Sequence, residues 1–139
     1  LWEEVDLQAR LWVIPAERMK AGREHRIPLS DAAVALLRQQ EQVLLAGVNL
    51  VFPSVRDHKP LSDMTLTAVL RRMQRNDLTV HGFRSTFRDW AAEATDYPQE
   101  MAEMALAHVV SNKVEAAYRR GDMLEKRREM MQKWAEFIL

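Results

Sequence analysis

The chain has 139 residues, of which 47% are hydrophobic, and its 20 basic and 20 acidic side chains give a formal net charge of zero. This length predicts one domain with a core of its own, and the absence of cysteine excludes disulfides and thiolate zinc sites. No apolar run approaches the ~18–20 residues that span a membrane, and the balanced charge by itself argues mildly against nucleic-acid binding.

The first thirty residues predict a small antiparallel sheet. Apolar residues recur between Val5 and Ile14, and a second apolar stretch at 27–29 follows a polar segment. Residues 19–25 are therefore expected to form an exposed turn between two strands. The start of the chain does not resemble a signal peptide, and because it lacks an initiator Met we expect a fragment of a longer chain.

The rest of the chain is predicted to be helical. Ser30 is expected to cap a helix over 32–46, and Ser62 a second helix that runs to residue 74. Thr79 can cap a third helix, over 80–94. Further helices are expected over 99–107, 113–119 and 123–138. The fold class is thus mainly α with a small antiparallel β-sheet near the N-terminus (α+β), formed by residues 1–139 as a single domain.

Basic residues gather at three places despite the zero net charge. These are the segments 18–26, 71–75 and 126–128. From composition alone, solvated faces balanced by acidic residues are the favoured interpretation.

His81 and Arg84 are three residues apart at the expected start of a helix. This spacing places both on one helix face, where backbone N–H groups and the helix dipole favour an anion. A phosphate clamp is one interpretation, and a partly buried helix start with a salt-bridged Arg84 is the other. The pair by itself favours the second.

His108 and Tyr118 lie ten residues apart. His108 falls on the face of Met101 and Met104, so by itself it is expected to be a core histidine with one hydrogen bond. Tyr118 is either a core aromatic residue with its hydroxyl at the edge or a nucleophile among cations. A phenol, with a pKa of about 10, is a weak nucleophile at neutral pH, so the second role needs a base or positive charge nearby.

Together these segments are far more specific than any one of them. The sequence HGFR at 81–84, LAH at 106–108 and Tyr118 ten residues later resemble, in order and spacing, the signature of the tyrosine recombinases, or phage integrases. The similarity is greatest to the integrases of satellite phages and genomic islands. It extends to segments 14–20 and 116–128 and covers essentially the whole chain.

The resemblance implies a role for each matching residue. Tyr118 matches the nucleophile that forms a 3′-phosphotyrosine bond and releases a 5′-hydroxyl, and Arg84 matches the second of two arginines that bind the scissile phosphate. His81 matches the histidine that assists proton transfer at the nucleophile, and His108 the histidine that hydrogen-bonds the phosphate. Lys20 matches the lysine that protonates the leaving oxygen. No metal or cofactor is implied, because cations and hydrogen-bond donors stabilise the charge of the phosphorane.

The resemblance also implies partners and one departure from the family. The partners are double-stranded DNA at attachment sites and further copies of the protein in a tetramer on that DNA. The implied location is the cytoplasm, with the nucleoid when DNA is bound. The family's first phosphate-binding arginine lies on a helix before the sheet, and this sequence begins at the sheet. We therefore expect this piece alone to be deficient in cleavage and weak in DNA binding.

Two other functions stay open from the sequence. A non-catalytic DNA-binding or regulatory module derived from a recombinase would suit the balanced charge, but it would not require Tyr118. A metal-dependent hydrolase that uses His81 and His108 lacks metal-ligand spacing. Tyr97 is the other tyrosine of the chain, and its place before Pro98 favours a capping or packing role.

The last predicted helix carries an apolar stripe of Leu124, Met131, Trp134 and Ile138. We expect this stripe to fold back on the core of its own chain. In the family, terminal helices can instead dock on a neighbouring subunit, and an exposed stripe would mark such a site.

Overall fold

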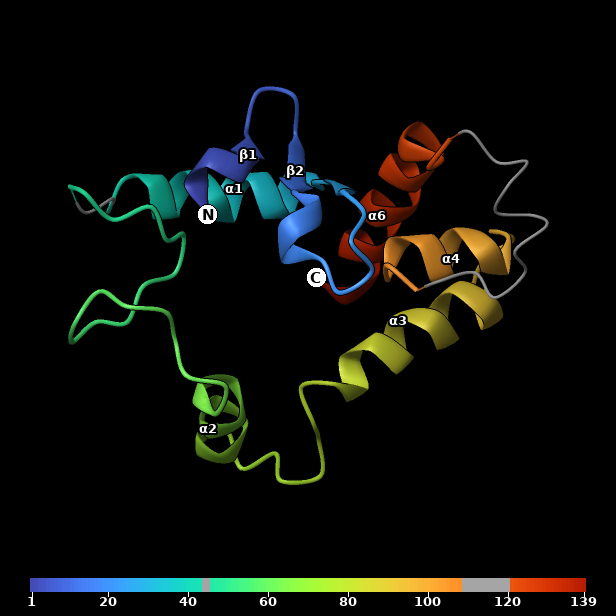
Figure 1. Ribbon diagram of the computed structural model, residues 1–139. Coiled ribbons are helices and arrows are strands. Elements are labelled where there is room, and N and C mark those ends of the chain that lie inside the picture. Colours follow the sequence, from blue (N-terminus) through green and yellow to red (C-terminus); the bar gives the residue numbers. More distant parts are fainter. Residues whose placement is uncertain (44–45, 109–120) are drawn as a thin grey trace.

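A three-stranded antiparallel sheet forms the N-terminal part of the computed structural model, which describes residues 1–43, 46–108 and 121–139. A short 3-10 helix, η1 (Trp2–Glu4), leads into β1 (Val5–Asp6), and β2 (Leu11–Ile14) lies between β1 and β3 (His25–Pro28) (Figure 1). A second 3-10 helix, η2 (Ala16–Arg18), opens the connection from β2 to β3. The small antiparallel sheet expected from the sequence is confirmed.

A buried carboxylate holds the two 3-10 helices together. Glu4 is 8% exposed and accepts hydrogen bonds from Trp12 Nε1, at 3.2 Å, and from Arg18 Nη1. Burial raises the pKa of Glu4, but the hydrogen bonds from Arg18, Trp12 and the amino group of Leu1 outweigh burial and hold that pKa at about 2. Glu4 therefore fixes the start of the β2–β3 connection, two residues before Lys20.

Helix α1 (Asp31–Glu41) begins where the sequence predicts and ends earlier. The Ser30 hydroxyl accepts a hydrogen bond from the Ala33 amide at 3.3 Å, which confirms Ser30 as the N-cap. The predicted extension to residue 46 is wrong. Its turns bury only Val34 and Leu37, and the polar residues 38–42 have no core to face. Tertiary packing thus ends the helix at Glu41.

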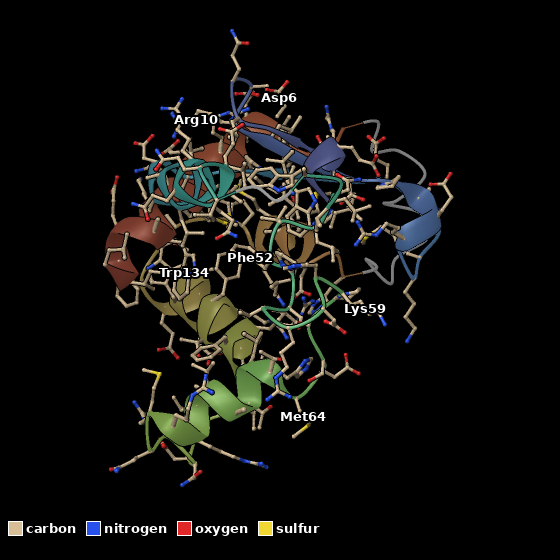
Figure 2. The ribbon with its side chains drawn as sticks, turned by 90° about the vertical axis from the view of Figure 1, so that its left-hand side faces the viewer. Asp6, Arg10, Phe52, Lys59, Met64 and Trp134 are labelled. Atoms are coloured by element: carbon tan, nitrogen blue, oxygen red, sulfur yellow. The ribbon has the colours of Figure 1, made fainter. Side chains whose placement is uncertain are left out.

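Helix α2 (Thr65–Arg72) is shorter than predicted at both ends. Ser62 does not cap it, because its hydroxyl lies 3.2 Å from the Thr65 hydroxyl and Met64 takes the N-cap position. The helix contains no buried residue and lies apart from the other helices (Figure 1). In Figure 2, Met64 lies at α2, well away from Trp134 and the core around it.

Three helices build the larger core. They are α3 (Gly82–Glu93), α4 (Gln99–Ala105) and α6 (Leu124–Ile138). The sequence predicted each of them with ends that agree to within two residues. The buried core cluster consists of Phe87, Trp90, Ala91, Met101, Ala102 and Met130.

Helix α6 folds back on this core, as expected, and part of the predicted stripe faces it. Met130 is fully buried, and Met131 and Trp134 pack against the cluster. The Trp134 ring meets Phe87 edge-on at 5.4 Å between centroids, a favourable aromatic geometry. Ile138, predicted to belong to the buried stripe, is 56% exposed because it lies in the last turn, beyond the core.

Tyr97 packs as the sequence suggested. Its ring contacts the α3–α4–α6 core, its hydroxyl donates to Glu129 at 3.2 Å, and the Lys133 ammonium lies 5.4 Å from the ring centroid. In the described part of the chain, no helix is long and apolar enough to cross a membrane.

Candidate functional site

Helices α3 and α4 lie side by side and bring Arg84 close to the segment that carries His108 (Figure 1). Arg84 Nη2 donates a hydrogen bond to the carbonyl of Leu106 at 2.5 Å. The last carbonyls of a helix have no partner within that helix, so Arg84 satisfies one of them. A guanidinium has five N–H donors, and this bond uses one. The half-buried Arg84 is thus anchored, with donors left for an anion.

His108 lies just beyond the end of α4. Ala107 adopts a left-handed conformation with φ of 54°, and the His108 amide donates to the carbonyl of Glu103 at 2.9 Å. The prediction of His108 on the face of Met101 is therefore wrong, because the helix ends at Ala105. Its side chain is 41% exposed, which also excludes the core-histidine interpretation.

An acidic residue orients the His108 ring. Nδ1 lies 2.5 Å from Glu103 Oε2, and Arg88 Nε lies 2.9 Å from the other oxygen of the same carboxylate. A carboxylate only accepts, so Nδ1 carries the proton. In the neutral ring Nε2 is then an acceptor, whereas the imidazolium donates from both nitrogens. Protonated His108 would therefore offer a donor and a positive charge to a phosphate.

His25, at the start of β3, is a site neighbour that the sequence analysis did not single out. Burial and the charge of Arg127 lower the pKa of His25. The hydrogen bond to the Ala105 carbonyl and the charge of Asp122 raise this pKa, but they offset the lowering only in part. The carbonyls of Ala105 and Leu106 thus face His25 and Arg84 respectively. The one signal of His25 in the sequence was its membership of the basic segment 18–26.

The lowered pKa of His25 predicts a pH dependence of stability. The unfolded chain protonates His25 more readily than the folded chain does. The contribution of neutral His25 to the free energy of unfolding is therefore fully present above the unfolded pKa, about 6.5, and is lost as the pH falls below that value. We expect His25→Gln, which can still donate to the Ala105 carbonyl, to lose less unfolding free energy between pH 7.5 and pH 5 than the wild type. Urea titrations at both pH values measure this, with His58→Gln as the control. Equal pH slopes in the wild type and His25→Gln would refute the prediction.

His81 occupies the N-cap position of α3. Its carbonyl accepts from the Arg84 amide at 3.1 Å, while the Thr79 hydroxyl accepts from the Gly82 amide at 3.0 Å. Thr79 therefore accepts a bond from the first amide of the helix, but the predicted cap is wrong because His81 occupies the N-cap position. His81 thus lies just before the helix, not on the helical face that the sequence predicted. The exposed His81 side chain makes no hydrogen bond with the rest of the described chain.

Lys20 lies in the connection between β2 and β3, as predicted, and is exposed. Within the described residues, no hydrogen bond or ion pair joins Lys20 to His81 or Arg84. Tyr118 lies outside the described residues. The structure therefore brings Arg84 and the His108 segment together and places Lys20 and His81 on exposed connections.

An ionic network joins β3 to the start of α6, and the sequence analysis missed it. Arg26 donates to both oxygens of Asp122, from Nε at 2.8 Å and from Nη2 at 2.7 Å. Arg127, 1% exposed, donates to the Asp122 carbonyl from Nε at 2.8 Å and to its carboxylate from Nη2 at 3.1 Å. No spacing rule could reveal it, since 96 residues separate Arg26 from Asp122.

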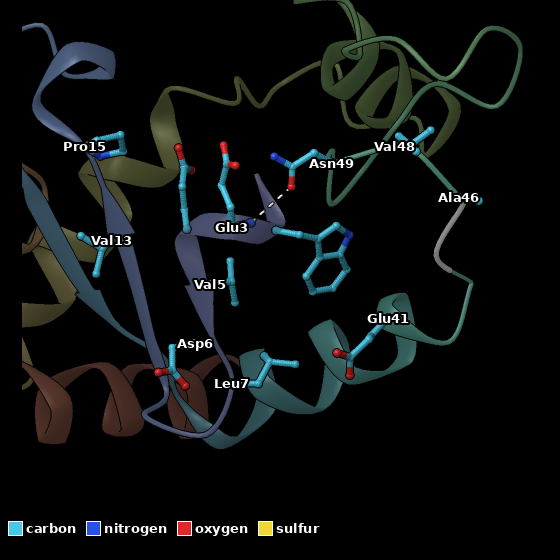
Figure 3. Close-up of a pocket in the computed structure, with 13 residues that line it drawn as sticks. Glu3, Val5, Asp6, Leu7, Val13, Pro15, Glu41, Ala46, Val48 and Asn49 are labelled. Atoms are coloured by element: carbon cyan, nitrogen blue, oxygen red, sulfur yellow. Dashed lines mark hydrogen bonds between the residues drawn. The ribbon is translucent and has the colours of Figure 1, made fainter.

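A surface pocket lies elsewhere, against the outer end of the sheet (Figure 3). Glu3, Val5 and residues 46–49 contribute to it, and the Glu3 amide donates to Asn49 Oδ1 at 3.3 Å. Of the predicted site residues that the structure describes, which are Lys20, His81, Arg84 and His108, none lines it. In the parts of the chain that the structure describes, no three His, Asp or Glu side chains are grouped to hold a metal ion.

The sequence matches the model of the phage integrase family over residues 1–125. The chain therefore belongs to the phage integrase family, which confirms the resemblance and the expected α+β fold class. No solved structure matches the chain significantly.

Curated relatives carry integrase names. Prophage integrase IntA of Escherichia coli (strain K12) is 42% identical over 139 residues, which cover 99% of this chain and 33% of that protein. The integrase of Enterobacteria phage P4 is 34% identical over 154 residues, with 99% and 35% covered. The integrase of Shigella phage Sf6 is 32% identical over 139 residues, with 99% and 36% covered. The chain thus spans about a third of the length of these relatives.

Proposed function

We propose that residues 1–139 form most of the catalytic domain of a tyrosine-type site-specific recombinase that integrates DNA. Family membership over residues 1–125 supports this proposal, and the observation that carries it is the geometry of the α3–α4 pair. Arg84 is anchored to the carbonyl of Leu106, and Leu106 lies two residues before the exposed His108, whose ring Glu103 orients. Two fixed cationic or donor groups at one helix end are suited to binding a phosphate.

The proposed reaction is a transesterification that begins at Tyr118. The tyrosine oxygen attacks the scissile phosphorus as its proton passes to His81. The bond from phosphorus to the 5′ oxygen breaks, and Lys20 gives a proton to that oxygen. Arg84 and protonated His108 stabilise the charge on the intervening phosphorane. The product is a 3′-phosphotyrosine and a 5′-hydroxyl, so the phosphodiester is conserved as a covalent bond and a second 5′-hydroxyl can rejoin the strand.

The proposed partner is double-stranded DNA at attachment sites, bound by a tetramer of the complete gene product. A protein that recombines chromosomal DNA acts in the cytoplasm, and it is associated with the nucleoid while it is bound to that DNA. A non-catalytic DNA-binding or regulatory module is the second candidate, and the zero net charge of the chain is the observation in its favour. Covalent chemistry distinguishes the two.

Covalent trapping on DNA tests the proposal. The complete gene product is first used to select its preferred duplex from a random-sequence pool. That duplex, nicked near the site of strand cleavage so that the freed strand end diffuses away, is then incubated with the protein in the presence of chelator. We expect a chelator-resistant protein–DNA adduct that carries the 3′ phosphate and leaves a 5′-hydroxyl. Selective binding without any adduct, for nicks placed at every position of the duplex, would support the non-catalytic module.

A further inference from the structure

The carboxylate of Glu103 connects helices α3 and α4, which lie side by side (Figure 1). Its side chain is 19% exposed, and each of its oxygens faces a different partner. Oε2 lies 2.5 Å from His108 Nδ1, and Oε1 lies 2.9 Å from Arg88 Nε on α3. The three side chains therefore form a series of contacts that runs from α3 through Glu103 to the ring of His108.

Arg88 offsets the burial of one oxygen of this carboxylate. Glu103 Oε1 is buried and, among the described residues, has no hydrogen-bond partner. Arg88 Nε lies close to it without the alignment of a hydrogen bond, so the attraction between opposite charges compensates for the water that burial removes. Arg88 is 49% exposed, and an ion pair with so exposed a cation adds little to stability. The pair is therefore better suited to holding the carboxylate in one position.

Helix α3 contacts the end of α4 at two points. Arg84 and Arg88 are four residues apart, and side chains at this spacing share one face of a helix. Arg84 donates to the carbonyl of Leu106, and Arg88 pairs with Glu103. His108 follows Leu106 by two residues, so their Cα atoms lie within about 7 Å of each other. The anchor of Arg84 and the orientation of His108 therefore both depend on the same face of α3.

We propose that Glu103, braced by Arg88, is a positioning residue that holds the His108 ring in one orientation for the phosphate. This inference rests on the proposed recombinase function and adds a role for two residues that contact no reacting atom. Because Glu103 accepts from Nδ1, Nε2 is the nitrogen that the protonated ring has left to donate to a phosphate. Without the carboxylate the ring is free to turn, and displacement of a group at the reacting centre by about 1 Å can lower a rate by about 100-fold.

Glu103→Ala in the complete gene product removes the acceptor, and adduct formation is measured against DNA concentration. We expect the rate at saturating DNA to fall about 10- to 100-fold and the half-saturating concentration to stay within about twofold. Glu103→Gln keeps an acceptor oxygen at the same reach, so it should recover part of the rate. The matched control is Glu93→Ala, the same change at the exposed end of α3, which should keep the wild-type rate.

Arg88→Met tests the brace, because Met keeps an apolar stem and removes the guanidinium. If Arg88 acts through Glu103, the change lowers the saturated rate about three- to tenfold in the wild type and has no further effect in Glu103→Ala. A loss of the same size in both backgrounds would show that Arg88 acts independently of Glu103 and would overturn the brace.

The ring of His108 supplies a readout that does not depend on cleavage. Nitrogen NMR of histidine-labelled protein distinguishes the protonated nitrogen of a neutral imidazole from the unprotonated one. We expect Nδ1 of His108 to carry the proton in the wild type, and the Nε2 form to appear as well in Glu103→Ala. The exposed His58 is the internal reference and should be the same in both proteins. A wild-type ring with its proton on Nε2 would refute the positioning.

The remaining outcomes separate this inference from the proposed function. A wild type that binds DNA and forms no adduct refutes the proposed function, and the inference that rests on it. If the wild type forms adduct and Glu103→Ala equals it, the positioning role is refuted while the recombinase function stands. A higher half-saturating concentration with an unchanged saturated rate would make Glu103 a determinant of DNA binding instead. Equal losses in Glu103→Ala and Glu93→Ala would reduce the effect to general charge and overturn the proposal.

Discussion

Replacing Tyr118 by Phe is expected to remove the covalent protein–DNA adduct, with a loss of more than about 1,000-fold, down to the limit of detection. The phenyl ring keeps its size and hydrophobicity, so packing changes little, whereas the oxygen that would bond to phosphorus is gone. DNA affinity should stay within about twofold, because the hydroxyl is one polar group among many contacts to the duplex. Adduct formation on the nicked duplex and an equilibrium binding titration measure the two quantities.

Tyr97→Phe is the matched control, since it makes the same chemical change at the other tyrosine. The Tyr97 hydroxyl donates to Glu129 on α6, 32 residues away in sequence, and its ring packs on the core. Its loss should lower the melting temperature slightly, because the acceptor is exposed to solvent, and leave the adduct intact. An adduct that survives Tyr118→Phe and disappears in Tyr97→Phe would show that Tyr97 is the nucleophile. The spacing between His108 and Tyr118 would then be coincidental.

Local sequence signals predicted the elements that depend on local chemistry. The Ser30 cap, the bond from the Gly82 amide to the Thr79 hydroxyl and the turn that contains Lys20 all depend on residues within three or four positions of one another. Helix ends were less predictable. The chain leaves α1 at Glu41 and α4 at Ala105 because of where the core stops and where Ala107 turns left-handed, and neither is visible in apolar periodicity.

The same distinction holds for the site. The spacing of the motifs singled out Arg84 and His108, and the structure places their segments together. Their neighbours were not predictable in the same way. His25 comes from a distant part of the chain, and Glu103 reaches His108 only because the helix ends between them. Such partners depend on the tertiary fold, so a single sequence without the structure gave no reason to select them.

Arg84→Ala is expected to reduce the rate of adduct formation by about 100- to 1,000-fold, the usual effect of removing one stabilising donor from a charged transition state. DNA affinity should change much less, because the phosphate carries more charge in the transition state than in the ground state. Arg72→Ala, an exposed cation on α2, is the control and should keep the wild-type rate. Single-turnover rates at saturating DNA measure the effect.

The substitution Arg84→Lys separates charge from geometry. Arg84 spends one N–H on the Leu106 carbonyl and can present the others to a phosphate, because its donors are fixed in one plane. A lysine keeps the charge but has a single nitrogen, so it either replaces the bond to Leu106 or reaches the phosphate. We therefore expect Arg84→Lys to recover less than about a tenth of the wild-type rate. Full recovery would mean that Arg84 acts as a point charge and that its bond to α4 is incidental. A lower melting temperature with an unchanged rate in Arg84→Ala would instead make Arg84 a structural link between α3 and α4.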